Sequence, residues 1–473
     1  MTSKTKATAA VAVATNSKSS KRLKVSCDLP VPEIPTVNGT VLVCGMGDMG
    51  QLGLGEDEVE KKRPTLVSTM NGINVVDVCA GGMHSLCLTD DGKLYSFGCN
   101  DEGALGRDST AEGSEFTPKI IELPDVCVKI SAGDSHSACL LADGRVFAWG
   151  SFRDSHGNMG LTVDGNKRLP TEILPGHTCC DLASGADHLV MLSCNGKVYT
   201  MGCGEQGQLG RVTLRTASGD SRRGKKELLE PNVVQVRAST HIETIWATTY
   251  CTFARSYKTK EIFAFGLNNY FQLGLQKKTT DLVIRPMQTS FKDIKTISGG
   301  QHHTLSLNND NICLTIGRKD YGRLGLGKSM SADVQELTPI VELKDIVDVA
   351  CGDAQSFAIA RTGKLYAWGM GSNLQLGTGT ESDADEPTLI TSKQTQDKHI
   401  IRVASGGQHT LFLIKNENNH NHERGDQKTA TEETTFKSNK KQPDNSQVEM
   451  QDDIKLNGAG TSQPTKKGQK RKH

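Results

Sequence analysis

The sequence predicts an all-β protein whose main part is a seven-bladed β-propeller, closed by pairing of its N- and C-terminal strands. One observation is a glycine-rich motif present in seven copies, typified by Gly202-Cys-Gly-Glu-Gln-Gly-Gln-Leu-Gly210. Its leading glycines lie 51 to 64 residues apart, at positions 45, 98, 150, 202, 266, 317 and 369. A period near fifty residues is typical of propeller blades. The second observation is that the first and last repeats are incomplete in complementary ways.

The composition excludes several classes of protein. The 473 residues carry 55 Lys and Arg against 54 Asp and Glu, so the whole chain is not a simple polycation. Fourteen cysteines without a C-x-x-C pair favour reduced thiols in an intracellular protein over disulfides. The apolar run from Ala7 to Ala14 is short and interrupted by threonine, and no run approaches the roughly twenty residues of a membrane helix. We therefore expect neither a signal peptide nor a membrane segment.

Both ends of the chain are predicted to be disordered basic tails. Residues 1–38 are rich in Lys, Thr, Ser, Ala and Pro, without helix or strand periodicity. Residues 416–473 contain few aliphatic side chains and end in a basic cluster. A cluster in the first tail fits nuclear import or phosphate contact, with a solubilising tail as the alternative; it consists of Lys18, Lys21, Arg22 and Lys24. The second tail fits import, nucleic-acid tethering or simple solvation.

Between the tails, residues 39–415 repeat one supersecondary unit. In the second repeat the apolar run 85–88 is followed by Asp91-Gly92 and then by the run 94–98. Asp-Gly and Asn-Gly between short apolar runs indicate type I′ hairpin turns, which need positive φ. The strand 40–44 lacks a preceding half-repeat, and the run 405–414 lacks a following one. Pairing these two strands would close the ring and remove both sheet edges.

Two repeats depart from the others in length. In the third corner motif the distance between the outer glycines is ten residues, from Gly150 to Gly160, whereas the other six copies have eight. We expect this longer connection to protrude as a wedge toward a partner, with a tolerated insertion as the alternative. The fourth repeat is longer by about twelve residues around 214–230 and contains Arg222 and Arg223. This basic loop is expected to meet an acidic partner, or else to be a solvated excursion.

Single residues also vary at the Gly-Gly-x-His corners. One register holds histidines that are expected to brace blade loops and to lie on one face of the ring: His84, His136, His188, His302 and His409, with Gln355 in a sixth copy. The position of Gly82, Gly300 and Gly407 is occupied by Asp134 and Asp353 in their own repeats. The next position holds Met83, Ser135, Gln301 or Gln408, but Asp187 in the fourth copy, and the fifth copy has Tyr250 and no histidine.

No pattern of an enzyme that makes or breaks covalent bonds is found. The sequence has no nucleophile context, no metal-ligand spacing and no phosphate-cradling loop, so neither a metal nor a cofactor is expected. A surface that holds a macromolecule is the better interpretation. A non-catalytic scaffold that binds chromatin or another protein is the alternative function, and a kelch-type propeller is a weaker alternative for the fold.

The repeats resemble those of the regulator of chromosome condensation family across residues 39–415. The resemblance is carried by Gly-x-x-x-x-Gly-Gln-Leu-Gly corners, Ala/Ser-Gly-Gly-x-His loops, and the stretches 96–108, 131–136, 149–154 and 299–304. It implies a monomeric guanine-nucleotide exchange factor for the small GTPase Ran, held on nucleosomes through DNA and the histone acidic patch. It further implies nuclear localisation, importin binding by the basic tail, and roles in nucleocytoplasmic transport, spindle assembly and nuclear envelope formation.

The resemblance also implies site residues. Those tied to exchange are Asp134, Asp187 and His302. Those that contact Ran are Asp48, His84, Phe152, Arg153, Asp154, Arg211 and His409. Arg222 and Arg223 match the nucleosome-binding loop, and the third-corner excursion matches the family's β-wedge.

Overall fold

The computed structural model describes residues 27–218, 222–237, 240–275 and 280–416. Within these ranges the chain forms thirty strands and two short α-helices, and the fourteen cysteines are unpaired. No helix in these ranges is long and apolar enough to cross a membrane. The basic import cluster at Lys18, Lys21, Arg22 and Lys24 lies outside the described residues, as does the predicted C-terminal tail from residue 417.

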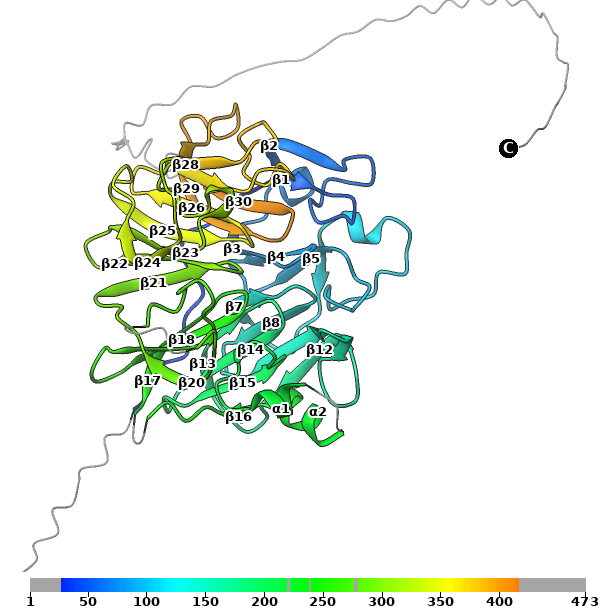
Figure 1. Ribbon diagram of the computed structural model, residues 1–473. Helices are drawn as coiled ribbons and strands as arrows, with labels where there is room; N and C mark the ends of the chain where they lie inside the picture. The colour runs from blue at the N-terminus through cyan, green and yellow to red at the C-terminus, as the bar shows by residue number, and fades with distance from the viewer. Residues whose placement is uncertain (1–26, 219–221, 238–239, 276–279, 417–473) are drawn as a thin grey trace, which may run out of the picture. The chain divides into compact units, whose positions relative to one another are not determined.

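Seven blades of four antiparallel strands follow one another around a ring (Figure 1), and the pairing of Gly39 with Val75 joins blades 7 and 1. Blade 1 contains β3 (Val75–Ala80), β4 (His84–Thr89), β5 (Leu94–Gly98) and β6 (Lys119–Ile121). Blade 2 contains β7 (Cys127–Ala132), β8 (His136–Leu141), β9 (Val146–Gly150) and β12 (Lys167–Ile173). Blade 3 contains β13 (Cys179–Ser184), β14 (His188–Ser193), β15 (Val198–Gly202) and β16 (Asn232–Val233). Blade 4 contains β17 (Ile242–Ala247), β18 (Cys251–Ser256), β19 (Ile262–Leu267) and β20 (Leu282–Gln288).

The remaining blades include the one that closes the ring. Blade 5 contains β21 (Ile294–Gly299), β22 (His303–Asn308), β23 (Cys313–Gly317) and β24 (Val334–Pro339). Blade 6 contains β25 (Ile346–Cys351), β26 (Gln355–Ala360), β27 (Leu365–Gly369) and β28 (Ala384–Leu389). Blade 7 contains β29 (Ile400–Ser405) and β30 (His409–Lys415) from one end of the chain, with β1 (Gly39–Met46) and β2 (Glu60–Leu66) from the other. Single 3-10 turns lie at Ser68–Met70, Ser114–Phe116 and Asp320–Gly322.

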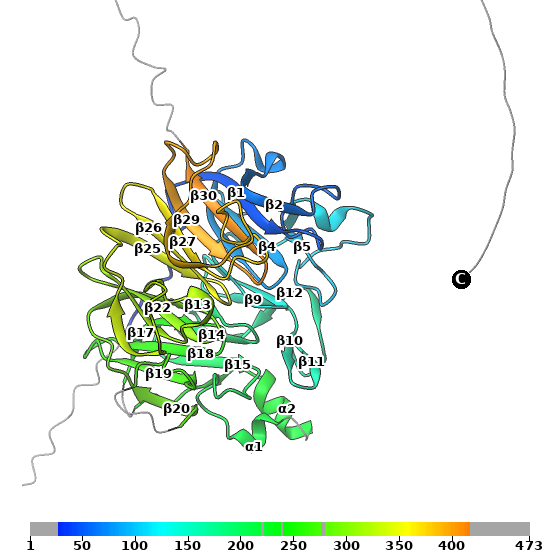
Figure 2. The same cartoon turned by 45° about the horizontal axis from the view of Figure 1, so that its top comes forward.

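The predicted closure of the ring is confirmed. Strands β1 and β30 pair in an uninterrupted antiparallel register from Gly39 opposite Lys415 to Gly45 opposite His409, and they lie side by side in Figures 1 and 2. An ion-pair bridge near the axis reinforces this junction. Arg402 of blade 7 lies 2.8 Å from Asp348 of blade 6 and 3.5 Å from Asp77 of blade 1. Because both ends of the chain contribute strands to one sheet, β1 and β30 each cover the edge that the other would leave open.

The core lies between neighbouring blades. All six residues of β4, β8 and β14 are buried, because the second strand of each blade is covered on both faces. One apolar cluster joins blades 2 and 3, and another joins blades 3, 4 and 5. Each blade therefore needs its neighbours to bury its hydrophobic residues, as expected for a repeat architecture.

A hydrogen-bonded latch connects successive blades. The first residue of the second strand reaches into the next blade: His84 Nε2 lies 2.8 Å from the hydroxyl of Ser137, and His409 Nε2 lies 2.8 Å from that of Ser85. Equivalent contacts join His136 to Ser184, His188 to Thr252, His303 to Ser356 and Gln355 to Ser405. The Ser137 hydroxyl donates to the Ala104 carbonyl, so Nε2 of His84 must carry the proton.

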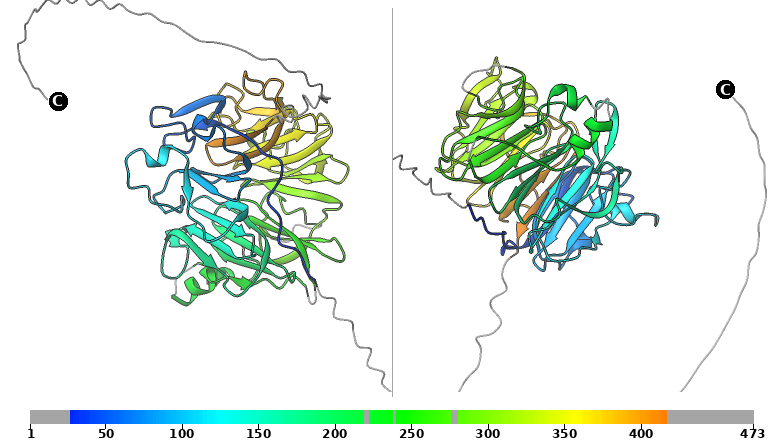
Figure 3. Two further views of the ribbon diagram at one scale, coloured as in Figure 1. Left: turned by 180° about the vertical axis from the view of Figure 1, so that it is seen from behind. Right: turned by 90° about the horizontal axis from the view of Figure 1, so that it is seen from below.

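The N-terminal boundary differs from the expectation of a disordered tail through residue 38. Residues 27–38 run in an extended path across one side of the ring, visible in the left panel of Figure 3. Cys27 is buried, the Leu29 amide donates to the Cys194 carbonyl over 2.8 Å, and Val31 and Ile34 pack against the core. Prolines hold this segment extended while alternate apolar side chains face the blades. Composition alone did not distinguish this packed segment from disorder.

The long connection of blade 3 also differs from the expected loop. It forms helix α1 (Leu214–Ala217) and helix α2 (Arg222–Leu229), within a fold that is otherwise β. Thr213 caps α1 by accepting the Thr216 amide. Leu228 and Leu229 of α2 are buried in the cluster of blades 2 and 3. The excursion is thus anchored on the ring by its apolar face.

We predict that the latch makes the ring sensitive to acid. Burial lowers the pKa of His84 to about 4 and that of His409 to about 3, below the ordinary value near 6.5. The unfolded chain therefore binds more protons below pH 6.5, and the free energy of unfolding should decrease as the pH falls from about 6.5 toward 3. Urea denaturation of the full chain at several pH values would measure this decrease.

The matched variants are His409→Gln and His409→Ala. Gln355 already forms the latch of blade 6 through Nε2, so His409→Gln should keep the closed ring and show a weaker pH dependence. His409→Ala should lower the free energy of unfolding by roughly 2–5 kcal/mol, through a cavity and an unpaired hydroxyl. Equal stability of both variants at neutral pH would contradict the latch.

Candidate functional site

The loops between the first and second strands of all blades meet around the central axis. Adjacent loops are joined by backbone hydrogen bonds: the Asp134 amide donates to the Ala186 carbonyl over 2.8 Å, and the Gly407 amide donates to the Gly82 carbonyl over 3.2 Å. They surround a cavity of about 130 Å³ lined mostly by Gly, Ala, Ser and Thr. We call the side of the ring formed by these loops and the glycine-rich corners the loop face. It is the place where the variable residues of the repeats gather.

The leading glycine of each corner lets the corner lie directly against the backbone of the loop that precedes the second strand. Gly202 has φ +114°, and a Cβ there would lie 2.4 Å from the Asp187 carbonyl oxygen. Only glycine tolerates this conformation and approach. The backbone geometry of the blade therefore explains why the leading glycine occurs in all seven copies. The positions that vary between copies remain as candidates for function.

Asp134 and Asp187 lie next to each other on the loop face. Asp134 lines the central cavity and is exposed to solvent, but burial by the surrounding protein raises its pKa to about 7. The charges of Asp353 and Asp187 add to the rise. Asp187 is half-buried and accepts a hydrogen bond of 2.7 Å from the Arg153 amide. Burial raises the pKa of Asp187 to about 6, although this hydrogen bond opposes the rise. The two carboxylates form an electrostatically unfavourable pair that a cation would relieve.

Asp353 is a third acid of this group that was not among the predicted site residues. It is half-buried, and burial raises its pKa while a hydrogen bond from Gln301 and the charge of Arg323 oppose the rise. Its occurrence at the Asp134 position of its own repeat was the signal that could have identified it.

The register of His302 was predicted incorrectly. Strand β22 begins at His303, which pairs with Gly317 as His84 pairs with Gly98. His303 is therefore the buried latch residue, and His302 occupies the position of Asp187 on the loop face. Gln301, not Gly300, occupies the position of Asp134 and Asp353: the Gly300 amide donates to the His303 carbonyl, as the Gly81 amide does to the His84 carbonyl.

Aromatic and cationic side chains surround His302. Its ring centroid lies 5.1 Å from that of Tyr270 and 6.4 Å from that of Tyr250, and Arg318 stacks on Tyr270 at 5.0 Å. Burial, together with the charges of Arg323 and Arg318, lowers the pKa of His302 to about 4. The repeat pattern of the sequence does not indicate this group. Tyr250 occupies the Asp187 position of blade 4, where the sequence by itself shows only that the histidine is missing.

The third-corner excursion is a β-hairpin of its own, separate from the blades in Figure 2. It consists of β10 (Phe152–Asp154) and β11 (Gly157–Gly160). Its Arg153 amide binds Asp187, so the hairpin and the acidic pair lie on the same face. Arg153 is half-exposed and forms a 3.0 Å ion pair with Glu102. Phe152 is fully buried with its ring 4.7 Å from that of His136, so it anchors the hairpin and is not available for direct contact.

Several predicted contact residues occupy architectural positions. His84 and His409 are only 1% and 0% exposed, because they form the latch. This confirms their expected bracing role and corrects their assignment to a contact surface. Arg211 directs its guanidinium onto the carbonyls of Thr200, Glu227 and Glu230, where it holds the end of α2. Asp48 remains exposed in the first corner, where it accepts a long hydrogen bond of 3.4 Å from Gln51. Arg222 and Arg223 begin helix α2, but their side chains lie outside the described residues.

Known proteins share this sequence and this fold. The family model described as RCC1-like domain matches residues 40–412. A Drosophila melanogaster protein named regulator of chromosome condensation is 54% identical over 398 residues, covering 84% of this chain and 72% of the relative. A Saccharomyces cerevisiae protein named guanine nucleotide exchange factor SRM1 is 31% identical over 78% of this chain and 85% of the relative.

Two solved structures extend the comparison. The crystal structure of Prp20p from Saccharomyces cerevisiae, described with its binding to Gsp1p and histones, has a TM-score of 0.75 at 30% identity, covering 82% of this chain and 94% of Prp20p. The structure of Kap60 bound to yeast RCC1 has a TM-score of 0.77 at 28% identity, covering 86% of this chain and 97% of that one. The sevenfold repeat, the closed ring and these similarities lead to one conclusion: the chain belongs to the regulator of chromosome condensation family.

Proposed function

We propose that this protein is a guanine-nucleotide exchange factor for the small GTPase Ran and that it acts while bound to nucleosomes in the nucleus. The relative named as an exchange factor, and the neighbour that binds Gsp1p and histones, support this proposal. The neighbour bound to Kap60 supports importin as a further partner. The observation that carries the proposal is the Arg153 amide on the Asp187 carboxylate, because it places a protruding hairpin beside an acidic group on one face.

The mechanism that we propose is mechanical and electrostatic. A Ran-type GTPase holds its nucleotide through backbone amides, a lysine and Mg²⁺. The β10–β11 hairpin would press on the nucleotide-binding loops, while Asp134 and Asp187 hold cationic side chains of the GTPase. Acceleration of release by about 10⁵ needs roughly 7 kcal/mol, which a single carboxylate does not supply. A broad rigid face is required, and the latched ring provides one.

Exchange of this kind makes and breaks no covalent bond. Binding of the factor and binding of nucleotide are linked, so each weakens the other by the same factor. Cellular nucleotide levels then set the direction of net exchange. Nucleosome binding, with the basic α1–α2 connection toward histone acid and the tails toward DNA phosphate, would restrict the product to chromatin.

The first prediction of this mechanism concerns Asp187. Replacement by Asn removes the charge and keeps the size of the side chain, so release of labelled GDP from Ran should slow by at least tenfold while the melting temperature changes little. Gly207→Val is the contrasting variant: φ is +82° and a Cβ would lie 2.9 Å from the Val283 carbonyl oxygen, so this change should unfold the ring. GDP release that is still catalysed at the full rate by Asp187→Asn would exclude the proposed role of Asp187. If the unmodified protein does not catalyse GDP release at all, a non-catalytic scaffold is favoured.

The second prediction is a pH dependence of exchange. With pKa values of about 7 and 6, Asp134 and Asp187 lose charge as the pH falls from 8 to 5.5, so the catalysed rate should decrease over this interval. The raised values also mean that the folded state binds more protons than the unfolded one, so this pair stabilises the fold below about pH 4 and loses that contribution as the pH rises through 6 to 7.

The measurement is the rate of GDP release against pH, corrected for release induced by EDTA alone. Asp134→Asn and Asp187→Asn should each flatten the profile. A profile that is unchanged in both variants would assign the pH dependence to the GTPase.

A further inference from the structure

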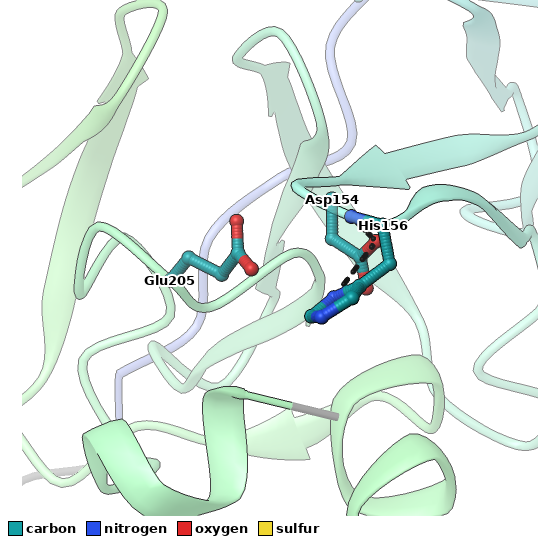
Figure 4. A group of neighbouring side chains, drawn as sticks. All are labelled: Asp154, His156 and Glu205. Atoms are coloured by element: carbon teal, nitrogen blue, oxygen red, sulfur yellow. Dashed lines mark hydrogen bonds and ion pairs between the residues drawn. The ribbon is translucent and has the colours of Figure 1, made fainter. Parts of the chain in front are cut away.

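Three potential metal ligands meet at the tip of the β10–β11 hairpin. Asp154 and His156 belong to the hairpin, and Glu205 comes from the glycine-rich corner of blade 3. One ligand atom from each residue lies within 4.8 Å of the other two. Figure 4 shows the imidazole beside the Asp154 carboxylate, with Glu205 facing the hairpin from the neighbouring loop.

Hydrogen bonds hold the two loops in this arrangement. The His156 amide donates to Asp154 Oδ1 over 2.8 Å, which fixes the turn, and the imidazole Nδ1 lies 3.8 Å from the same oxygen. The Ser155 amide donates to Glu205 Oε2 over 3.0 Å, which joins the turn to blade 3. These backbone hydrogen bonds hold the turn that carries Asp154 and His156 against Glu205, whereas the exposed imidazole can still rotate.

The carboxylates of this group are held by hydrogen bonds from Ser155 and from the His156 amide. Among the residues that the structure describes, neither Asp154 nor Glu205 forms an ion pair with a lysine or an arginine. Burial raises the pKa of Asp187 and of Cys203, and the charges of Asp154 and Glu205 add to both rises. Two negative charges beside an imidazole thus present a net negative site for a cation.

The exposure of the ligands permits a metal to enter. The side chain of His156 is 67% exposed, whereas that of Asp154 is only 12% exposed. Ligands of a tetrahedral zinc ion lie roughly 3.3 Å apart, as follows from bond lengths near 2.0–2.1 Å. Rotation of the exposed imidazole and a small shift of Glu205 would bring the three atoms to that separation, and water would complete the coordination.

We propose that Asp154, His156 and Glu205 form a binding site for a divalent transition-metal ion of the zinc class. One imidazole nitrogen with two carboxylates suits zinc, whereas Mg²⁺ and Ca²⁺ prefer oxygen ligands alone. The bound ion would cross-link the hairpin to the corner of blade 3, next to Asp187. Ligand spacing in the sequence did not indicate this site, because Glu205 lies far along the chain from the hairpin.

The test is calorimetric titration of zinc into the full chain, without any GTPase. All samples would carry His420→Asn and His422→Asn, because these residues of the C-terminal segment offer a competing His-x-His pair. On this background we expect one zinc site, weakened at least tenfold by His156→Asn and by Glu205→Gln. His177→Asn removes an exposed histidine outside the site and should change nothing.

Cobalt absorption gives a second reading of the same site. A visible d–d band should appear on Co²⁺ addition and disappear in His156→Asn. The proposal is overturned if zinc does not bind on this background, or if it binds His156→Asn with unchanged affinity and stoichiometry. Because the GTPase is absent, these outcomes are independent of the exchange activity proposed above.

Discussion

The buried hydrogen bond from each blade to the next is the interaction on which the rest of this structure depends. In four of the latches the serine or threonine hydroxyl also donates to a corner carbonyl of the preceding blade, as Ser137 does to Ala104 and Ser85 does to Gln51. One hydroxyl thus joins the imidazole, the neighbouring strand and the glycine-rich corner. Since these groups are buried, loss of any partner leaves a polar atom unsatisfied at a considerable cost. The corners that form the loop face are therefore held by the same contacts that hold the ring.

This dependence explains how one repeat can be both rigid and variable. The latch residue and the leading glycine are fixed by burial and by close backbone approach, but the residue immediately before the latch points to the loop face. That position holds Asp187 in blade 3, Tyr250 in blade 4 and His302 in blade 5. A partner thus meets the acidic side chain of blade 3 next to the aromatic side chains of blades 4 and 5, on a frame that does not change. Variation at this position can therefore change the chemistry of the loop face without altering the packing of the blades.

The repeat period, the hairpin turns and the closure of the ring could be predicted because each depends on local residues that recur. The protruding hairpin could also be predicted, since its two extra residues interrupt an otherwise constant spacing. The burial of Phe152 could not, because a resemblance carries over residue positions but not the direction of side chains. For His84 and His409, recurrence of the histidine predicted a bracing role, which the latch confirms, whereas the resemblance implied a contact role. The shift between His302 and His303 arose because the Gly-Gly pair of that repeat begins one residue earlier than in the others. The packing of residues 27–38 could not be predicted from their prolines, since prolines occur both in disordered tails and in extended segments.

The raised pKa values of Asp134 and Asp187 have a further physical meaning. Carboxylates that repel one another in a partly desolvated site destabilise the free protein when both are ionised, so the structure retains them at a cost in stability. Cationic groups of a partner would relieve the repulsion, and the relief would appear as affinity. A latch that holds the loops fixed prevents the carboxylates from moving apart before the partner arrives. In the proposed binding, repulsion between the acids and rigidity of the ring would act together, because a flexible face would let the carboxylates move apart before a cationic partner could relieve the repulsion.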